Sequence, residues 1–339
     1  MGENLFLSKE WVYICVNRTR RASRQISVPQ AGHFFYMNSI EKQFPLLPDQ
    51  IKILQQRGLE IDDSDEANHY LAHVGYYRLA DYWQFLQKDS VRNAFISGAT
   101  FNHVIELYNF DRELRLLLLD AMERIEVSFR AIMINMMCPV YGSNWFTDKR
   151  IFFNEARLND AIEKIDRELE RSDEEFVKQH DKKKTGFEHP PAWKTLPILS
   201  FGTLSKIYRN IRDDIKEKRI IAKVYGLPQE RWLQSWMQVV SILRNYCAHH
   251  SLICYRPFSF LPREIRQVKL PWIKNIPPAG SVVSEQLYYQ ICIVRYLLQT
   301  ASPGNDFSYR LMELLVKYRG IDLEKMGFLE NWDEEDLWQ

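Results

Sequence analysis

The chain has 339 residues, of which 46% are hydrophobic and 26% are charged, and its formal net charge at pH 7 is +1. This balance excludes a chain that is disordered throughout, and no uncharged apolar run is long enough to span a membrane. The small net charge excludes a protein that binds nucleic acid through a basic body, so RNA binding would require a local patch.

The two ends of the chain differ from its middle in charge. Residues 1–36 contain RTRRASRQ and no sustained hydrophobic period, which predicts a basic, disordered extension. We expect the domain over 37–325 and an acidic, Trp-containing tail over 326–339. The five cysteines are scattered without a Cys-x-x-Cys pair, and the N-terminus resembles no signal peptide. These features predict reduced thiols and a cytoplasmic protein.

The placement of turn-forming residues along the chain indicates helices. Gly and Pro number only 13 and 14, so few turn formers interrupt the apolar periods. Gly58 and Gly75 are placed as helix ends, and Asp63 followed by Glu66 resembles a capping box. In chain order, the predicted helices cover residues 49–56, 63–73, 101–138, 157–178, 201–215, 231–250, 282–299 and 306–319. No strand alternation is convincing, so we predict an all-α helical bundle.

Two predicted helices carry the clearest apolar stripes. In 101–138, which Pro139 is expected to end, the stripe comprises Phe110, Leu114, Leu117, Ala121, Ile125, Phe129, Ile132 and Met136. In 231–250 it comprises Leu233, Trp236, Val240, Leu243 and Cys247. We expect both stripes to be buried.

One short segment, RNYCAHH (244–250), combines groups suited to chemistry. Arg244, Asn245, His249 and His250 follow directly on the second apolar stripe. The Arg-to-His spacing is weak by itself, and composition favours a helix end with histidines near the negative dipole.

Two other segments allow both a structural and a functional interpretation. His69 and His73 have a spacing that can chelate a metal, but no further ligand accompanies them, which favours ordinary histidines. The aromatic cluster in GYYRLADYW (75–83) favours core packing over a platform for base stacking.

Five segments, in order, resemble the Abi-like proteins, the AbiD/AbiF group of phage abortive-infection proteins within the HEPN superfamily. They are GYYRLADYW (75–83), LYNFDRELR (107–115), RIEVSFRA (124–131), PPAWKTLPILSFGTLSKIYRNI (190–211) and RNYCAHH (244–250). The resemblance runs from Leu46 to Arg256 and implies a HEPN-type bundle with additional N-terminal and C-terminal helices. Relatives carry an Arg, an aromatic residue and an Asn-Arg pair after the two histidines. Here SLICYRPF follows, and Arg256 is the residue that can stand in.

The resemblance implies a metal-independent endoribonuclease that uses no cofactor. A ribose 2′-hydroxyl would attack the adjacent phosphate, so DNA would be inert. His249 would transfer protons and Arg244 would stabilise the charge of the phosphorane. Asn245 would orient the site, and His250 would contact RNA or act as a second acid, unless it is a structural histidine at the helix end.

The resemblance also implies partners. HEPN nucleases pair two such motifs across a two-fold interface, and this chain has one motif, which predicts a homodimer with a composite cleft. The positive floor of that cleft would come from Lys182, Lys183 and Lys184, or from Lys206 and Arg209. Some relatives are restrained by a neighbouring small RNA, so a small non-coding RNA antitoxin is an expected partner and a membrane is not.

Two other functions remain open. The chain could be a non-catalytic helical module that binds RNA without cutting it. It could also be a protein-interaction scaffold that docks through NWDEEDLW (331–338).

Overall fold

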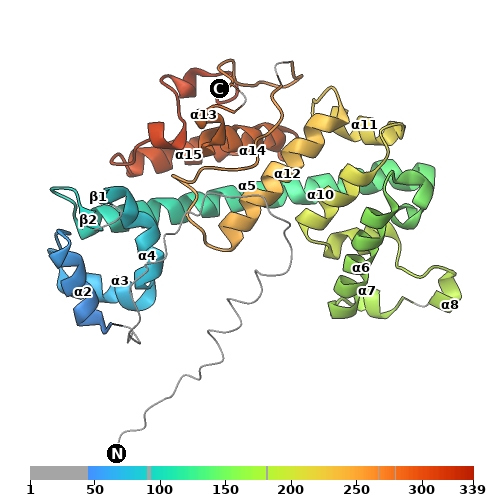
Figure 1. The fold of residues 1–339 in the computed structure, drawn as a ribbon. Coiled ribbons are helices and arrows are strands. Elements are labelled where there is room, and N and C mark those ends of the chain that lie inside the picture. Colours follow the sequence, from blue (N-terminus) through green and yellow to red (C-terminus); the bar gives the residue numbers. More distant parts are fainter. Residues whose placement is uncertain (1–44, 90–92, 181, 266, 279) are drawn as a thin grey trace, which may run out of the picture. The chain divides into compact units, whose positions relative to one another are not determined.

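A computed structural model describes residues 45–339 except 90–92, 181, 266 and 279. The predicted extension over 1–36 and the first residues of the predicted domain therefore lie outside the described residues. Those described belong to one unit, Pro45–Gln339, which is built of α-helices and one two-stranded sheet (Figure 1). The predicted all-α class is confirmed.

The helices follow one another through short connections, except for the irregular segment before α13. The α-helices are α2 (Leu47–Gln56), α3 (Ser64–His73), α4 (Tyr76–Trp83), α5 (Phe101–Tyr141), α6 (Glu155–Arg171), α7 (Glu175–Lys178), α8 (Lys182–Thr185), α9 (Ala192–Thr195), α10 (Phe201–Asn210), α11 (Lys216–Val224), α12 (Glu230–Ala248), α13 (Val282–Glu285), α14 (Leu287–Ala301) and α15 (Phe307–Lys317). The 3-10 helices are η1 (Gln84–Leu86), η2 (Trp145–Thr147), η3 (Lys149–Ile151), η4 (Leu196–Ile198), η5 (Glu324–Met326) and η6 (Trp332–Glu334). Strands β1 (Gln87–Asp89) and β2 (Ala94–Phe95) pair antiparallel.

Helix α5 is the axis of this unit. It begins where the Thr100 hydroxyl accepts a hydrogen bond from the main-chain amide of His103, and it ends at Gly142, whose φ is 85°. Pro139 was expected to end the helix, but it lies inside the last turn and the helix continues to Tyr141. The glycine ends the helix because it adopts a positive φ without a Cβ clash.

The predicted stripe of α5 is buried as far as Phe129. Beyond that point the prediction was wrong by one position, because Met133 and Met137 are buried while Ile132 and Met136 are only half-buried. Helices α9 and α11 pack against this end of α5. The partners of α5 thus decide which residues of its last turns face the core.

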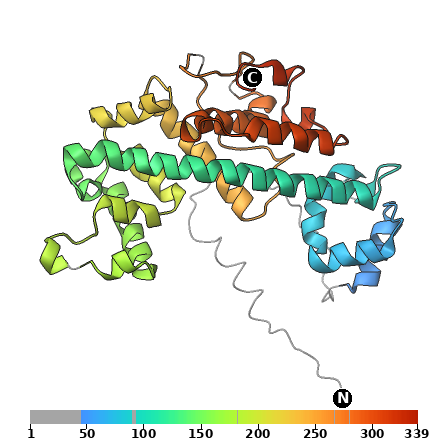
Figure 2. The ribbon, with the colours of Figure 1, turned by 180° about the vertical axis from the view of Figure 1, so that it is seen from behind.

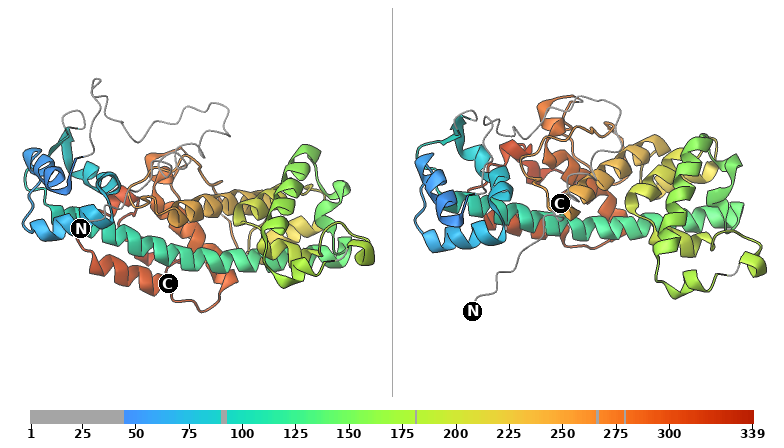
Figure 3. Two further views of the ribbon diagram at one scale, coloured as in Figure 1. Left: turned by 90° about the horizontal axis from the view of Figure 1, so that it is seen from below. Right: turned by 60° about the horizontal axis from the view of Figure 1, so that its bottom comes forward.

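Helix α12 is held by its neighbours along most of its length. It packs against α5, α10, α11 and α14, while α14 and α15 also pack on α5 (Figures 2 and 3). All five residues of its predicted stripe, Leu233, Trp236, Val240, Leu243 and Cys247, are buried, which confirms that prediction. Its C-terminal end reaches the surface, because Asn245, His249 and His250 are exposed.

Two predicted helices are interrupted in the structure. The helix over 157–178 is replaced by α6 and α7, and the helix over 201–215 breaks after Asn210, where α10 ends; α11 begins only at Lys216. The second break occurs because Ile211 pairs with Phe152 in an antiparallel bridge, and the Arg212 amide donates to the carbonyl of Ile151 at 2.9 Å. A backbone contact with a distant segment overrides the local helical period. The short hairpin β1–β2 gave no alternation signal because its strands are two and three residues long.

The acidic C-terminal tail packs on the same unit. Leu337 and Trp338 are buried, and the Trp338 indole N–H donates to the hydroxyl of Tyr288 on α14 at 3.2 Å. The buried carboxylate of Glu335 accepts hydrogen bonds from the main-chain amides of Lys274 and Asn275, at 2.7 and 3.0 Å. The tail therefore fixes the irregular segment that precedes α13.

Candidate active site

The predicted catalytic residues lie at the C-terminal end of α12. Arg244 is on the last turns of the helix, and 41% of its side chain is exposed. His249 is the C-cap, and its main-chain amide donates to the carbonyl of Asn245 at 2.9 Å. Asn245, His249 and His250 are exposed, so these side chains are accessible from solvent. The surface they form is open.

His250 has an unusual backbone conformation. Its φ is 57°, in the left-handed region that a residue with a Cβ adopts only at some cost. The guanidinium of Arg78, on α4, donates a hydrogen bond to the His250 carbonyl. A residue of the GYYRLADYW segment thus holds the turn that ends the RNYCAHH segment.

The loop that follows the two histidines is anchored on buried charges of α5. The Asp111 carboxylate, which is fully buried, accepts hydrogen bonds from the main-chain amides of Ile253 and Cys254 at 3.0 and 2.8 Å. Asp111 also forms a buried ion pair with Arg115. The Arg115 guanidinium in turn donates to the carbonyl of Ser251 at 3.3 Å. Two charged residues therefore fix both the start and the end of residues 251–254.

A tyrosine completes this network. The Tyr82 hydroxyl donates to Asp111 at 2.9 Å and accepts from Arg115 at 3.1 Å. Burial lowers the pKa of Arg115, but the charge of Asp111 and the Tyr82 hydroxyl outweigh burial, so that pKa lies above its ordinary value. The guanidinium stays charged, and its hydrogen bonds satisfy groups that burial would otherwise leave without partners.

Arg244 is supported from α5 by an acidic side chain. The Nε atom of Arg244 lies 4.0 Å from Oε2 of Glu126. Glu126 is mostly buried and its other carboxylate oxygen accepts from Arg130 at 2.7 Å. Arg130 also donates to the carbonyl of Leu199 at 3.1 Å. Glu126 thus lies between two guanidinium groups and limits the directions that Arg244 can take.

Arg256 lies against the motif itself. Its guanidinium is 4.4 Å from the ring centroid of Tyr246, and its Nε donates to the carbonyl of Leu252 at 2.9 Å. The structure therefore brings Arg256 to the helix that carries Arg244 and His249.

The two alternatives for the basic floor lie on different helices. Lys183 and Lys184 are exposed on α8, and the side chain of Lys182 lies outside the described residues. On α10, Lys206 is exposed and Arg209 donates to the Gln238 amide oxygen of α12 at 3.2 Å.

Five residues that support the site escaped the sequence analysis: Arg78, Tyr82, Asp111, Arg115 and Glu126. All five lie inside segments that had been singled out for other reasons. The pairs Asp111–Arg115 and Glu126–Arg130 have the i, i+4 acid-to-base spacing of a helix. This spacing is the local signal that could have identified Asp111, Arg115 and Glu126.

No metal site is evident in the part of the chain that the structure describes. His69 and His73 lie on α3 with their ring centroids 4.6 Å apart, but no three His, Cys, Asp or Glu residues described there are grouped as metal ligands.

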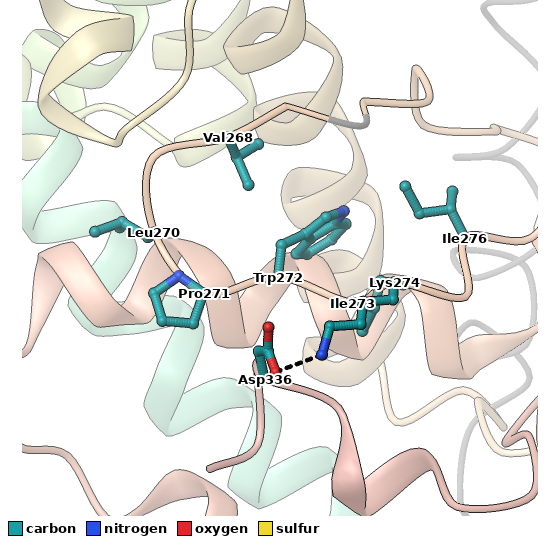
Figure 4. A pocket seen from close by; sticks show the side chains of 8 residues that line it. All are labelled: Val268, Leu270, Pro271, Trp272, Ile273, Lys274, Ile276 and Asp336. Atoms are coloured by element: carbon teal, nitrogen blue, oxygen red, sulfur yellow. Dashed lines mark hydrogen bonds and ion pairs between the residues drawn. The ribbon is translucent and has the colours of Figure 1, made fainter.

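A hollow of about 520 Å³ is lined by residues outside the RNYCAHH segment (Figure 4). Residues from 268–276 form most of its wall, among them Val268, Trp272 and Ile276. Its charged groups, Lys274 and Asp336, pair at 2.9 Å. The hollow offers no arrangement of groups for catalysis.

The aromatic cluster of GYYRLADYW divides between core and surface. Tyr82 and Trp83 are buried, whereas 70% of Tyr77 is exposed. Tyr82 and Trp83 therefore serve core packing.

Comparison with known proteins identifies the family. A family model described as Abi-like protein matches residues 69–254, more than half of the chain, and this range contains all five segments that carry the resemblance. No curated protein and no solved structure matches the chain. Among the described helices, none is long and apolar enough to cross a membrane. The family suggests abortive-infection phage defence and an involvement of nucleic acid, and it is compatible with a nuclease. The chain belongs to the Abi-like protein family.

Proposed function

We propose that this protein is a HEPN-type, metal-independent endoribonuclease that acts in phage defence on single-stranded or structured cellular RNA. The observation that carries the proposal is the exposed set of Arg244 and His249 on a helix end whose following loop is fixed by buried charges. An active site needs accessible reacting groups on a rigid support, and this arrangement provides both.

The residues suit an attack by the ribose 2′-hydroxyl on the adjacent phosphate. The oxygen–phosphorus bond to the 2′-oxygen forms, the bond to the 5′-oxygen breaks, and a 2′,3′-cyclic phosphate remains. A proton leaves the 2′-hydroxyl and one reaches the departing 5′-oxygen; His249 takes the first or supplies the second, because an imidazole nitrogen can accept or donate a proton. Arg244 stabilises the charge on the phosphate oxygens through its planar guanidinium.

Three further residues complete the proposed site. Asn245 orients the substrate, and His250 contacts RNA or serves as the second acid. Arg256, placed against Tyr246, supplies positive charge at the rim.

One Arg–His set on an open surface is an incomplete nuclease site. We therefore propose a homodimer in which two such sets face each other across an isologous contact. Sedimentation of the wild type is expected to give the mass of two chains, and a monomer at the concentration of full activity would contradict the dimer.

The partners and the location also belong to this proposal. An endoribonuclease that cuts cellular RNA must be restrained before infection, and a small non-coding RNA antitoxin would do so in the cytoplasm. RNA that copurifies with the catalytically inactive protein would identify such an inhibitor by sequencing.

Cleavage in EDTA tests the proposal. Wild type, Arg244→Ala and His249→Ala are incubated with end-labelled single-stranded RNA, total tRNA and a DNA oligonucleotide of the same sequence. Arg231→Ala, at the other end of α12, and His69→Ala, exposed on α3, are the matched controls. We expect the wild type and both controls to cut RNA, to leave 2′,3′-cyclic phosphates and to spare DNA.

Each other outcome has a defined meaning. Cleavage that persists in both active-site variants would contradict the assignment of the site. Binding without cleavage by every protein would favour the non-catalytic RNA-binding module. Absence of both binding and cleavage would favour the scaffold.

A further inference from the structure

We propose a second RNA contact in a hollow between α7, α8 and α9, which would hold one unpaired nucleobase and its phosphate from a single-stranded segment. The inference rests on the proposed function, because it assigns the class of RNA that this nuclease would select. The hollow has a volume of about 410 Å³, and its lining includes Phe176, His180, Lys184, Trp193 and Lys194.

An exposed tryptophan forms one wall of this hollow. Trp193 is 52% exposed, although it lies on a short helix whose neighbouring residues are firmly held. The buried Ala192 amide donates to the carbonyl of Ser143 at 2.7 Å, and the buried Thr195 hydroxyl donates to the carbonyl of Pro190 at 2.7 Å. The indole is therefore a large aromatic surface on a rigid base, which is the arrangement that stacks on an unpaired base.

The charge of the hollow suits a phosphate. The Lys194 ammonium lies 5.9 Å from the ring centroid of Phe176, and Lys184 is exposed at the same hollow. Among the described residues that line the hollow, these two lysines are the ones with a fixed charge. Aromatic faces combined with cations are the features of sites for single-stranded nucleic acid.

A neighbouring hollow provides a contrast. It shares His180 but is lined by Asp166, Glu170 and Glu188. An RNA phosphate would be repelled from these carboxylates and attracted to the side of Lys194. The charge distribution thus predicts that the bound strand lies on the side of His180 that carries Lys194.

Hydrogen bonds to the main chain also hold residues of the lining in place. The His180 ring Nε2 must donate to the Phe187 carbonyl, 3.1 Å away, because a carbonyl can only accept. The Thr185 hydroxyl donates to the same oxygen at 3.4 Å.

The hollow and Arg244 share a framework. Leu199, six residues beyond Trp193, accepts from Arg130, and Arg130 pairs with the Glu126 that supports Arg244. An RNA segment that stacks on Trp193 would therefore contact a part of the fold that is connected, through Arg130 and Glu126, to Arg244 on α12.

Binding of an uncleavable strand tests the inference separately from catalysis. The probe is a fluorescent 2′-O-methyl oligonucleotide of about ten nucleotides, whose blocked 2′-oxygen cannot attack the phosphate. Its dissociation constant is measured by fluorescence polarisation at several salt concentrations for wild type, Trp193→Ala, Trp193→Phe and Lys194→Gln. Phe153→Ala, another exposed aromatic, and Lys223→Gln, an exposed lysine on α11, are the controls.

We expect the two kinds of variant to act differently. Trp193→Ala should weaken binding about fivefold to a hundredfold without changing the salt dependence, and Trp193→Phe should recover most of the affinity. Lys194→Gln should reduce the slope of log affinity against log salt by about 0.7, the value for one phosphate contact on a single strand. Neither control should change either quantity, and melting curves should show that all variants are folded.

The results also separate this inference from the nuclease. If the wild type cuts RNA while all pocket variants bind like the wild type, the second contact is wrong and the nuclease stands. If binding depends on Trp193 but no RNA is cut, the second contact stands and the nuclease fails. Two results would overturn the second contact. One is a wild type that does not bind the probe. The other is an acidic peptide that displaces the probe equally well from the wild type and from Trp193→Ala.

Discussion

The Asp111 carboxylate accepts a hydrogen bond from the main-chain amide of Ile253, 142 residues later in the chain, at 3.0 Å. Together with the Cys254 amide and the Arg115 guanidinium, this contact ties the loop after the two histidines to the axis of the fold. The geometry of the candidate site thus depends on a buried charge that never touches solvent.

Substitution of this charge should destabilise the protein. Asp111→Asn would leave the buried Arg115 without its counterion, at a cost of about 3–5 kcal/mol. Asp120→Asn on the same helix is the control, because its half-exposed ion pairs with Arg124 and Arg310 should contribute less than about 1 kcal/mol. Urea unfolding compares the two variants, and equal losses would show that the buried pair has no special role.

Stability measurements can test which face of α12 is buried and which is exposed. Leu243→Ala should cost about 2–5 kcal/mol, because it opens a cavity at a fully packed position. His249→Ala should leave the free energy of unfolding nearly unchanged, because the imidazole is exposed. Thermal melting of both variants decides the question, and the reverse ranking would mean that the helix is turned the other way.

Arg78 should act on catalysis through position. Without its hydrogen bond to the His250 carbonyl, the left-handed turn loses a support, and displacement of a reacting group by about 1 Å can reduce a rate by about a hundredfold. Arg78→Ala is therefore expected to lower kcat for RNA cleavage while KM stays near the wild-type value. Tyr77→Ala, the exposed neighbour, is the control. A rise in KM with kcat unchanged would instead make Arg78 an RNA contact.

Alkaline pH should weaken the fold through the buried thiol of Cys247. Burial raises the pKa of this thiol from its ordinary value of 9.0 to about 12. The folded state therefore binds more protons than the unfolded state between these two values, so stability must fall as pH rises. For this one thiol the loss between pH 8 and pH 10 is on the order of 1 kcal/mol.

Urea midpoints at the two pH values measure this effect. Cys247→Ala should remove about that amount from the pH dependence, whatever its effect on stability at pH 8. An unchanged difference between pH 8 and pH 10 in the variant would show that other groups cause the loss.

The amino-acid sequence alone determined the helical class, the buried stripe of α12 and the exposed end that carries Arg244 and His249. These features follow from the 3.6-residue period, which is a local property of the chain. The tertiary structure alone decided the rest. It ended the predicted helix over 201–215 early, at Ile211, packed Trp338 against Tyr288 and brought Asp111 to Ile253. Such contacts join residues that are far apart in the chain, and a local pattern carries no information on which distant backbone a helix or a buried carboxylate will meet.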